Sequence, residues 1–254
     1  MAGENWGRRI VEQELGLNTV IHDDGTADGM YDLRIGPVNA PKFAIECFQA
    51  VDSAFTEIWN LGPARGPLNL SLENNWIVEV STKARLKTFK QNIESVLQEL
   101  ERRGIYNVLV DHHLKWRDTD LFARLSSLDI NHAFCYEMPG SGKVELGLPG
   151  IGGAVDEQGA AVPDWISGLL REPRYRDVLD KLERSGAAEN HAFVFVGFAG
   201  APWEVAGYLM GDMNQAPTQP PALPSPIKGV WIISQTARKG VRWDGIAWQL
   251  FKAN

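Results

Sequence analysis

Apolar and polar positions follow two different periods along the chain, and together they predict an α/β protein. Side chains at residues 31–35 alternate between apolar and polar, the period of a β-strand with one buried face. The run from Lys42 to Gln49 is mostly apolar, which is typical of a central strand covered on both faces. From Ser81 or Thr82 to about Arg103, apolar residues recur at three-and-four spacing and predict a long amphipathic helix.

The same reasoning covers the rest of the chain. Further helices are expected at residues 5–15, 53–60, 163–170, 175–185 and 201–212, and from Asp118 or Asp120 to Leu125. Further strands are expected at residues 19–22, 76–80, 106–110, 133–138, 143–148, 192–198, 230–234, 241–243 and 246–251. Residues 76–110 form a strand, helix, strand unit, which predicts a parallel pair of strands, and residues 133–148 predict a hairpin.

The order of these elements predicts one α/β domain over residues 1–254, with a mixed central sheet flanked by helices. Its core is expected over about residues 1–200. The Pro-rich stretch 216–226 is a loop, and C-terminal strands at about residues 227–254 elaborate the core.

Composition narrows the partners and the compartment. The formal net charge of −7 argues against a strongly basic nucleic-acid binder, although it leaves room for a local basic groove. Residues 1–9 lack the apolar core of a signal peptide, and no apolar run has membrane-spanning length, so no membrane partner is expected. Two cysteines provide no disulfide framework, which favours the cytoplasm. The oligomeric state stays open.

The candidate chemistry lies in the two strands on either side of the turn at residues 36–41. Glu46 sits in the middle of an apolar strand, where an isolated carboxylate is costly unless it is paired, protonated or bound to a cation. A hairpin across this turn places Asp32 beside Glu46. Magnesium prefers oxygen ligands of this kind, so Mg²⁺ is one natural resolution. The alternative is that Arg34 or a backbone amide satisfies Glu46.

These residues resemble the PD-(D/E)XK nuclease superfamily, which has the restriction-endonuclease-like fold. The resemblance implies that Asp32 and Glu46 hold magnesium and that the backbone carbonyl of Cys47 adds a third ligand. In this family a lysine two residues after the second acid helps to activate water, and here that position is Phe48. Lys42 shares the strand face of Glu46 by alternation and is the candidate substitute.

Two hypotheses follow from that departure. The first is a restriction-endonuclease-like protein with a degenerate site, acting as a weak magnesium-dependent nuclease in which Asp32, Glu46 and Lys42 are catalytic. The second is a non-catalytic binding or assembly protein that keeps the nuclease fold as a scaffold. Within the first, a glutamate of the N-terminal helix, Glu12 or Glu14, is a candidate to reach toward the metal.

Two other groups of residues have simpler explanations. Asp111, His112 and His113 end a strand, where polar loop residues are expected, and the loop explanation ranks above a zinc site. Trp231, Trp243 and Trp248 lie in predicted strands beside basic residues. Packing within the sheet is the leading explanation for them, ahead of a stacking platform for bases.

Overall fold

The computed structural model describes residues 2–26, 29–51, 60, 66–81, 83–114, 117–147, 156–197 and 200–253. Within these residues the chain is a mixed α/β protein with one sheet of seven strands and one of five. It divides into two compact units, unit 1 (Met1–Val51 and Gly152–Asn254) and unit 2 (Asp52–Ile151). The structure therefore differs from the single domain expected, because hydrophobic periodicity identifies strands but does not tell which sheet each strand joins.

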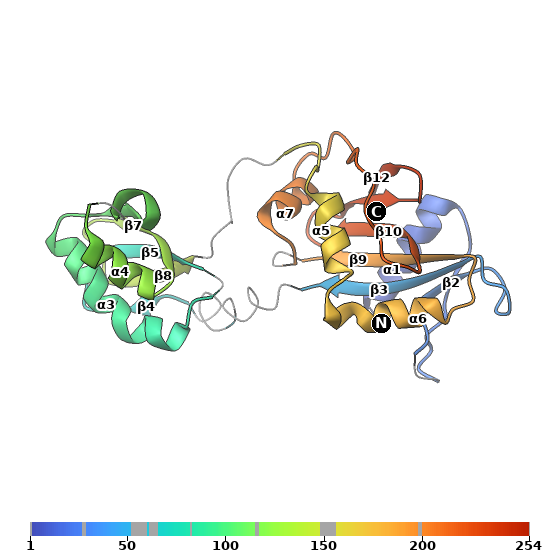
Figure 1. Cartoon of the computed structure of the whole chain (residues 1–254), viewed down its shortest axis with the longest axis horizontal. Coiled ribbons are helices and arrows are strands. Elements are labelled where there is room, and N and C mark those ends of the chain that lie inside the picture. Colours follow the sequence, from blue (N-terminus) through green and yellow to red (C-terminus); the bar gives the residue numbers. More distant parts are fainter. Residues whose placement is uncertain are drawn as a thin grey trace. The chain divides into compact units, whose positions relative to one another are not determined.

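Unit 1 contains the seven-stranded sheet (Figure 1). Its helices are α1 (Ala2–Leu15), α5 (Val162–Leu169), α6 (Arg176–Glu183) and α7 (Trp203–Met210). Its strands are β1 (Thr19–Ile21), β2 (Leu33–Ile35), β3 (Phe43–Ala50), β9 (Glu189–Val196), β10 (Ile227–Ser234), β11 (Lys239–Trp243) and β12 (Trp248–Lys252). Each of these elements overlaps a helix or strand expected from the sequence.

The strand order in this sheet is β1-β2-β3-β9-β10-β11-β12. The first three strands are antiparallel to one another, β3, β9 and β10 run parallel, and β11 and β12 return antiparallel. The C-terminal strands thus continue the main sheet directly from β10. The expected hairpin between residues 31–35 and 42–49 is confirmed.

Two apolar cores cover the two faces of this sheet. Helices α5, α6 and α7 lie on one face and bury Ala44 and Ala50 of β3 (Figure 1). Helix α1 lies on the opposite face, where Phe43 and Ile45 of β3 are buried. Strand β3 is therefore central and covered on both sides, as its nearly continuous apolar sequence predicted.

Unit 2 contains the five-stranded sheet, with strand order β4-β8-β5-β7-β6. Its strands are β4 (Leu68–Asn69), β5 (Asn75–Val80), β6 (Asn107–Leu109), β7 (Ile130–Glu137) and β8 (Lys143–Gly147). Its helices are α3 (Leu86–Arg102), a π-helical turn (Val110–Leu114) and α4 (Thr119–Ser127). The expected apolar stripe of α3 is buried, and the Asp118 side chain caps α4 by accepting a hydrogen bond from the Leu121 N–H at 3.0 Å.

Two predicted strand pairings in unit 2 are wrong. Strand β6 does not pair with β5, because β7 lies between them and is antiparallel to both. Strands β7 and β8 do not form a hairpin, because β5 lies between them. Adjacent strands in the sequence were taken as neighbours in space, and here the connection 138–142 passes around the end of β5.

Asn75 fastens that connection to β5. Its buried side chain accepts hydrogen bonds from the backbone N–H groups of Ser141 at 2.8 Å and Lys143 at 2.9 Å and donates one to Glu137. We expect Asn75→Ala to lower the free energy of unfolding of unit 2 by about 2 kcal/mol, because it removes the three hydrogen bonds of a buried side chain. Urea unfolding checks this. The exposed Asn92→Ala is the matched control and is expected to stay within about 0.5 kcal/mol.

The tryptophans of the C-terminal strands pack within the protein. Trp231 is fully buried and Trp248 is buried against Trp243, with ring centroids 5.6 Å apart, so packing explains them and a stacking platform is excluded for Trp231.

Asp111 to His113 lie in the π-helical turn instead of a loop. The helix expected at residues 53–60 lies outside the described residues except at residue 60. No helix within the described part of the chain is long and apolar enough to cross a membrane.

Candidate functional site

The β2–β3 hairpin brings Asp32 close to Glu46. Leu33 and Ile45 form the last antiparallel pair of the two strands, and Asp32 directly precedes Leu33 while Glu46 directly follows Ile45. Both acids are buried, with 6% and 4% of their surfaces exposed. The two carboxyl groups are close enough to interact, because the Asp32 carboxyl is, after burial, a cause of the raised pKa of Glu46.

The hydrogen bonds of the two acids leave one buried carboxyl oxygen without a partner, and this affects the charge that the site can hold. Asp32 Oδ2 accepts a hydrogen bond from the Cys47 backbone N–H at 2.6 Å, which fixes its carboxyl group beside the next residue of β3. Glu46 Oε2 is buried and has no hydrogen-bond partner. An unpartnered buried carboxyl oxygen is costly and is resolved by a proton or a cation.

The amine at this site comes from helix α6. Lys181 Nζ lies 2.7 Å from Glu46 Oε1, and the lysine side chain is 22% exposed while that of Glu46 is 5% exposed. Val178 and Leu182 of the same helix are buried in the core, so Lys181 stands at the border of the apolar stripe. Lys181 was not among the candidate site residues expected from the sequence. The order of elements gave a weak signal for it, because a lysine-bearing amphipathic helix followed by a polar turn and an apolar strand also resembles later parts of nuclease-like proteins.

Lys42 does not reach the acids. Its ammonium lies 5.2 Å from the centroid of the Phe43 ring, and Phe43 packs in the core on the α1 side of the sheet. The expectation that Lys42 substitutes for the missing lysine rested on strand alternation alone. The ammonium of the long side chain instead lies over the aromatic ring of the next residue in the chain.

Phe48 occupies the position where the nuclease resemblance expects a lysine. Its ring packs against Tyr175, with centroids 4.7 Å apart, as part of the core beneath α5 and α6. The Tyr175 hydroxyl in turn accepts a hydrogen bond from the Val51 N–H at 3.2 Å. This position is therefore a packing contact between β3 and the segment that leads into α6, which is the helix that carries Lys181.

Burial shifts the proton equilibria of both acids in the same direction. Burial and the nearby Asp32 carboxyl raise the pKa of Glu46 to about 8, against the opposing effect of the Lys181 ammonium. Burial raises the pKa of Asp32 to about 6, and the Cys47 N–H acts against that rise. Burial by itself lowers the pKa of Lys181, but Glu46 outweighs it and the net shift is upward. Two acids held close with raised pKa values bind protons or cations readily.

Helix α1 contributes charge to the site through Glu4. The Glu4 carboxylate adds to the rise in the pKa of Asp32, after burial as the larger cause. Glu12 instead pairs with Arg8 at 3.1 Å and accepts a hydrogen bond from the Thr19 N–H, so it fastens α1 to β1. Glu14 accepts a hydrogen bond from Gln13. The glutamate of this helix that influences the acids is therefore neither of the two expected.

The donors available for a metal at this site are oxygens. Within the described residues, no group of three or more His, Cys, Asp or Glu side chains is placed to hold a metal ion. The pair Asp32 and Glu46 offers two carboxyl groups, one with an unpartnered oxygen, and the Cys47 carbonyl follows Glu46 directly in β3. Such a set suits a hard ion such as Mg²⁺, which keeps several of its waters.

Comparisons of the chain with protein-family models, with curated proteins and with solved structures found no match. The site must therefore be interpreted from its own geometry and from the resemblance in residues 32–48.

Proposed function

We propose that this protein is a magnesium-dependent nuclease of restriction-endonuclease-like type whose catalytic amine is Lys181. The observation that carries the proposal is the three-part cluster itself. Two buried acids oppose each other on neighbouring strands, and an ammonium lies 2.7 Å from one of them. Acid, acid and amine are the groups that the resemblance in residues 32–48 requires, with the amine supplied from a helix instead of from β3.

The element order supports the same proposal. A helix precedes three antiparallel strands, and α6 precedes β9, which pairs parallel to β3. Asp32 directly precedes β2 and Glu46 lies in β3, an arrangement that supports the proposal. The element order also lets α6 cross the face of β3 that carries Glu46, which is how a lysine remote in sequence reaches the acids.

Each residue has a distinct part in the proposed reaction. Asp32, Glu46 and the Cys47 carbonyl would hold magnesium, which when bound supplies charge stabilisation at phosphorus and positions a water. Lys181 would orient the attacking water or neutralise charge on the phosphate, because its ammonium is fixed by Glu46 and keeps partial access to solvent. Phe48 and Tyr175 would hold α6 against β3 and so keep the amine in place.

Cleavage of nucleic acid tests this function directly. We expect cleavage of plasmid DNA or of single-stranded RNA that requires Mg²⁺ and stops when EDTA is added. Asp32→Asn is expected to abolish it while the protein stays folded in thermal melts. If the wild type with Mg²⁺ leaves both substrates intact, the catalytic proposal fails.

Magnesium binding gives a separate expectation. Asp32→Asn is expected to weaken Mg²⁺ binding at pH 8 at least about tenfold, because it removes one of two anionic ligands. Isothermal titration calorimetry measures the affinity. Asp120→Asn, which changes an exposed acid in the first turn of α4, is the control and is expected to bind Mg²⁺ as the wild type does.

A metal-binding scaffold without catalysis is the second candidate, and the packing of Phe48 favours it. The lysine position of the resemblance is occupied by a ring buried against Tyr175, and an ammonium bonded to Glu46 has one donor less for water. Magnesium binding that depends on Asp32, together with intact DNA and RNA, would establish this second function in place of the first.

A further inference from the structure

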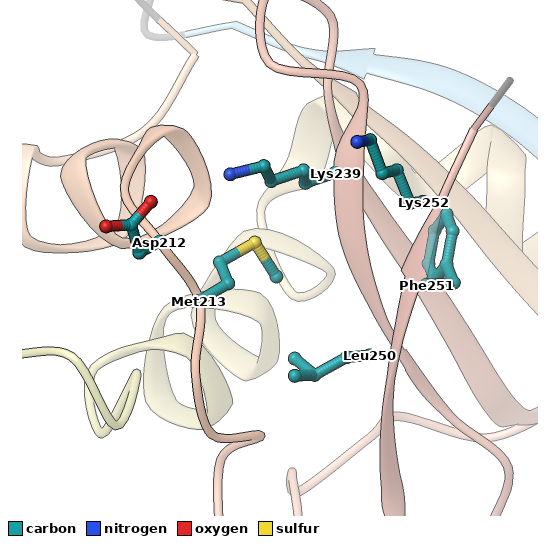
Figure 2. Close-up of a pocket in the computed structure, with 6 residues that line it drawn as sticks. All are labelled: Asp212, Met213, Lys239, Leu250, Phe251 and Lys252. Carbon is teal, nitrogen blue, oxygen red and sulfur yellow. The ribbon is translucent and has the colours of Figure 1, made fainter.

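A pocket in unit 1 lies at the edge of the sheet, apart from the two acids. It has a volume of about 260 Å³ and is lined by residues of the loop after α7 and of strands β11 and β12, namely Asp212, Met213, Lys239, Leu250, Phe251 and Lys252 (Figure 2). Asp32 directly precedes β2 and Glu46 lies on β3, toward the opposite edge of the same sheet. The pocket therefore belongs to a different part of unit 1.

Two lysines lie side by side on the strands that line this pocket. Lys239 of β11 pairs in register with Lys252 of β12, so both side chains project from the same face of the sheet. Figure 2 shows the amine of Lys252 near the backbone end of the Lys239 side chain, while the amine of Lys239 extends toward Asp212 above Met213. Like charges directly opposite each other on neighbouring strands are destabilising. An anion between them would convert that repulsion into attraction.

Protection of a sheet edge does not explain both lysines. An edge strand is often guarded by a lysine that points to solvent, and Lys252 on β12 fits that description. Lys239, however, lies on β11, which is paired on both sides. Its side chain is only partly exposed and its ammonium donates a hydrogen bond to the Gly211 carbonyl at 3.1 Å. That bond fixes one amine at the mouth of the pocket before any ligand arrives.

The remaining lining residues define the chemistry of the ligand. Met213 and Leu250 give the pocket an apolar wall below the amines (Figure 2). Met213 holds a left-handed backbone conformation with φ of 35°, a strained geometry of the kind that concentrates at ligand sites. Asp212 lies beside Lys239, so two positive charges and one negative charge leave a net charge of +1. A monoanion with a hydrocarbon part matches this arrangement better than a phosphate does.

We propose that the Lys239–Lys252 pocket binds a small organic carboxylate. The carboxylate bridges the two ammonium groups, and the hydrocarbon part lies against Met213 and Leu250. The volume corresponds to about nine water molecules and lies just below the usual range for ligand pockets, so the ligand is small, of roughly ten non-hydrogen atoms. This site is independent of the proposed nuclease activity.

Calorimetry with benzoate tests the proposal. Benzoate is expected to bind the full-length wild type with a dissociation constant on the order of 1 mM, and benzyl alcohol and inorganic phosphate at least about tenfold more weakly. Lys252→Gln is expected to weaken benzoate binding about tenfold or more. The matched control is Lys228→Gln, since Lys228 is, like Lys252, an exposed lysine of this sheet but does not line the pocket.

A thermal melt gives a second, independent result. Without ligand, Lys252→Gln is expected to raise the melting temperature, because it removes the repulsion between the two ammonium groups. Benzoate is expected to raise the melting temperature of the wild type and to leave that of Lys252→Gln unchanged. Benzoate binding that is absent, that survives in Lys252→Gln, or that phosphate equals would overturn the proposal.

Discussion

Lys181→Met is expected to reduce magnesium-dependent cleavage by roughly 10²–10⁴-fold, the range typical of a lost general acid, base or charge stabiliser. Methionine keeps most of the length of the lysine stem and its apolar contacts along α6, but it removes the ammonium 2.7 Å from Glu46. The loss should fall on kcat, because in the proposed reaction the amine acts on the reacting water or phosphate. Single-turnover cleavage with saturating Mg²⁺ measures it.

Lys42→Met is the matched control for this variant. Strand alternation predicted that Lys42 shares the strand face of Glu46. In the structure, however, its ammonium lies over the Phe43 ring. We expect Lys42→Met to cleave at the wild-type rate. Loss of activity in folded Lys42→Met with full activity in Lys181→Met would reverse the assignment of the amine.

A rescue variant makes the assignment sharper. Phe48 lies two residues after Glu46 on the same strand face, so Phe48→Lys returns an amine to β3. We expect Phe48→Lys combined with Lys181→Met to recover part of the lost cleavage. The loss of Phe48 packing against Tyr175 will lower stability, so thermal melts must accompany the rates.

The second large effect concerns stability as a function of pH. Glu46 has a pKa raised to about 8 in the folded protein, against 4.5 for an unperturbed glutamate. Between those values the folded state holds a proton that the unfolded state has released, so raising the pH disfavours folding. We expect the free energy of unfolding of the wild type, relative to Glu46→Gln, to fall by about 3 kcal/mol from pH 5 to pH 8.

The comparison with Glu46→Gln is needed because another buried group acts in the opposite sense. Burial lowers the pKa of His191 to about 4, so its contribution to stability is lost as the pH falls from 6.5 toward 4. That contribution is common to both proteins and cancels in the difference. Urea unfolding at pH 5, 6.5 and 8 gives the three points. A difference that stays constant, or that rises with pH, would contradict the buried acid pair.

The same urea unfolding experiment can be repeated with Mg²⁺. Ligation requires ionised carboxylates, so Mg²⁺ competes with protons at Asp32 and Glu46. We expect Mg²⁺ at about 10 mM, which is enough to occupy a weak site, to raise the free energy of unfolding of the wild type at pH 8. The increase should be much smaller at pH 5. The exposed Glu204→Gln, in the same unit, should follow the wild type throughout.

The acids were predictable from the sequence because they depend on local structure. A short turn joins two strands, so the hairpin and the opposition of Asp32 and Glu46 follow from residues within one stretch of chain. The contact of the amine with the acids was not predictable, because Lys181 and Glu46 are separated by 135 residues and meet through tertiary packing. Side-chain length also matters, since alternation placed Lys42 on the correct face but could not tell where its ammonium turns.

The fold shows the same division between local and long-range information. The buried stripe of α3 and the cap at Asp118 follow from neighbouring residues and are confirmed. The insertion of β5 between β7 and β8 depends on which strands meet across the sheet, and hydrophobic periodicity carries no signal for that. The separation into two units is of the same kind.

The interruption of unit 1 by unit 2 has a consequence for synthesis of the chain. Strand β3 is made early, but its parallel neighbour β9 follows only after the whole of unit 2. At ordinary rates of translation, the 135 residues between Glu46 and Lys181 take roughly 7–27 s to add. During that interval one edge of β3 lacks its partner and Glu46 lacks its ammonium, so the nascent protein carries an open, apolar strand edge of the kind that invites aggregation. Molecular chaperones that shield such edges should therefore matter most for chains arrested before α6.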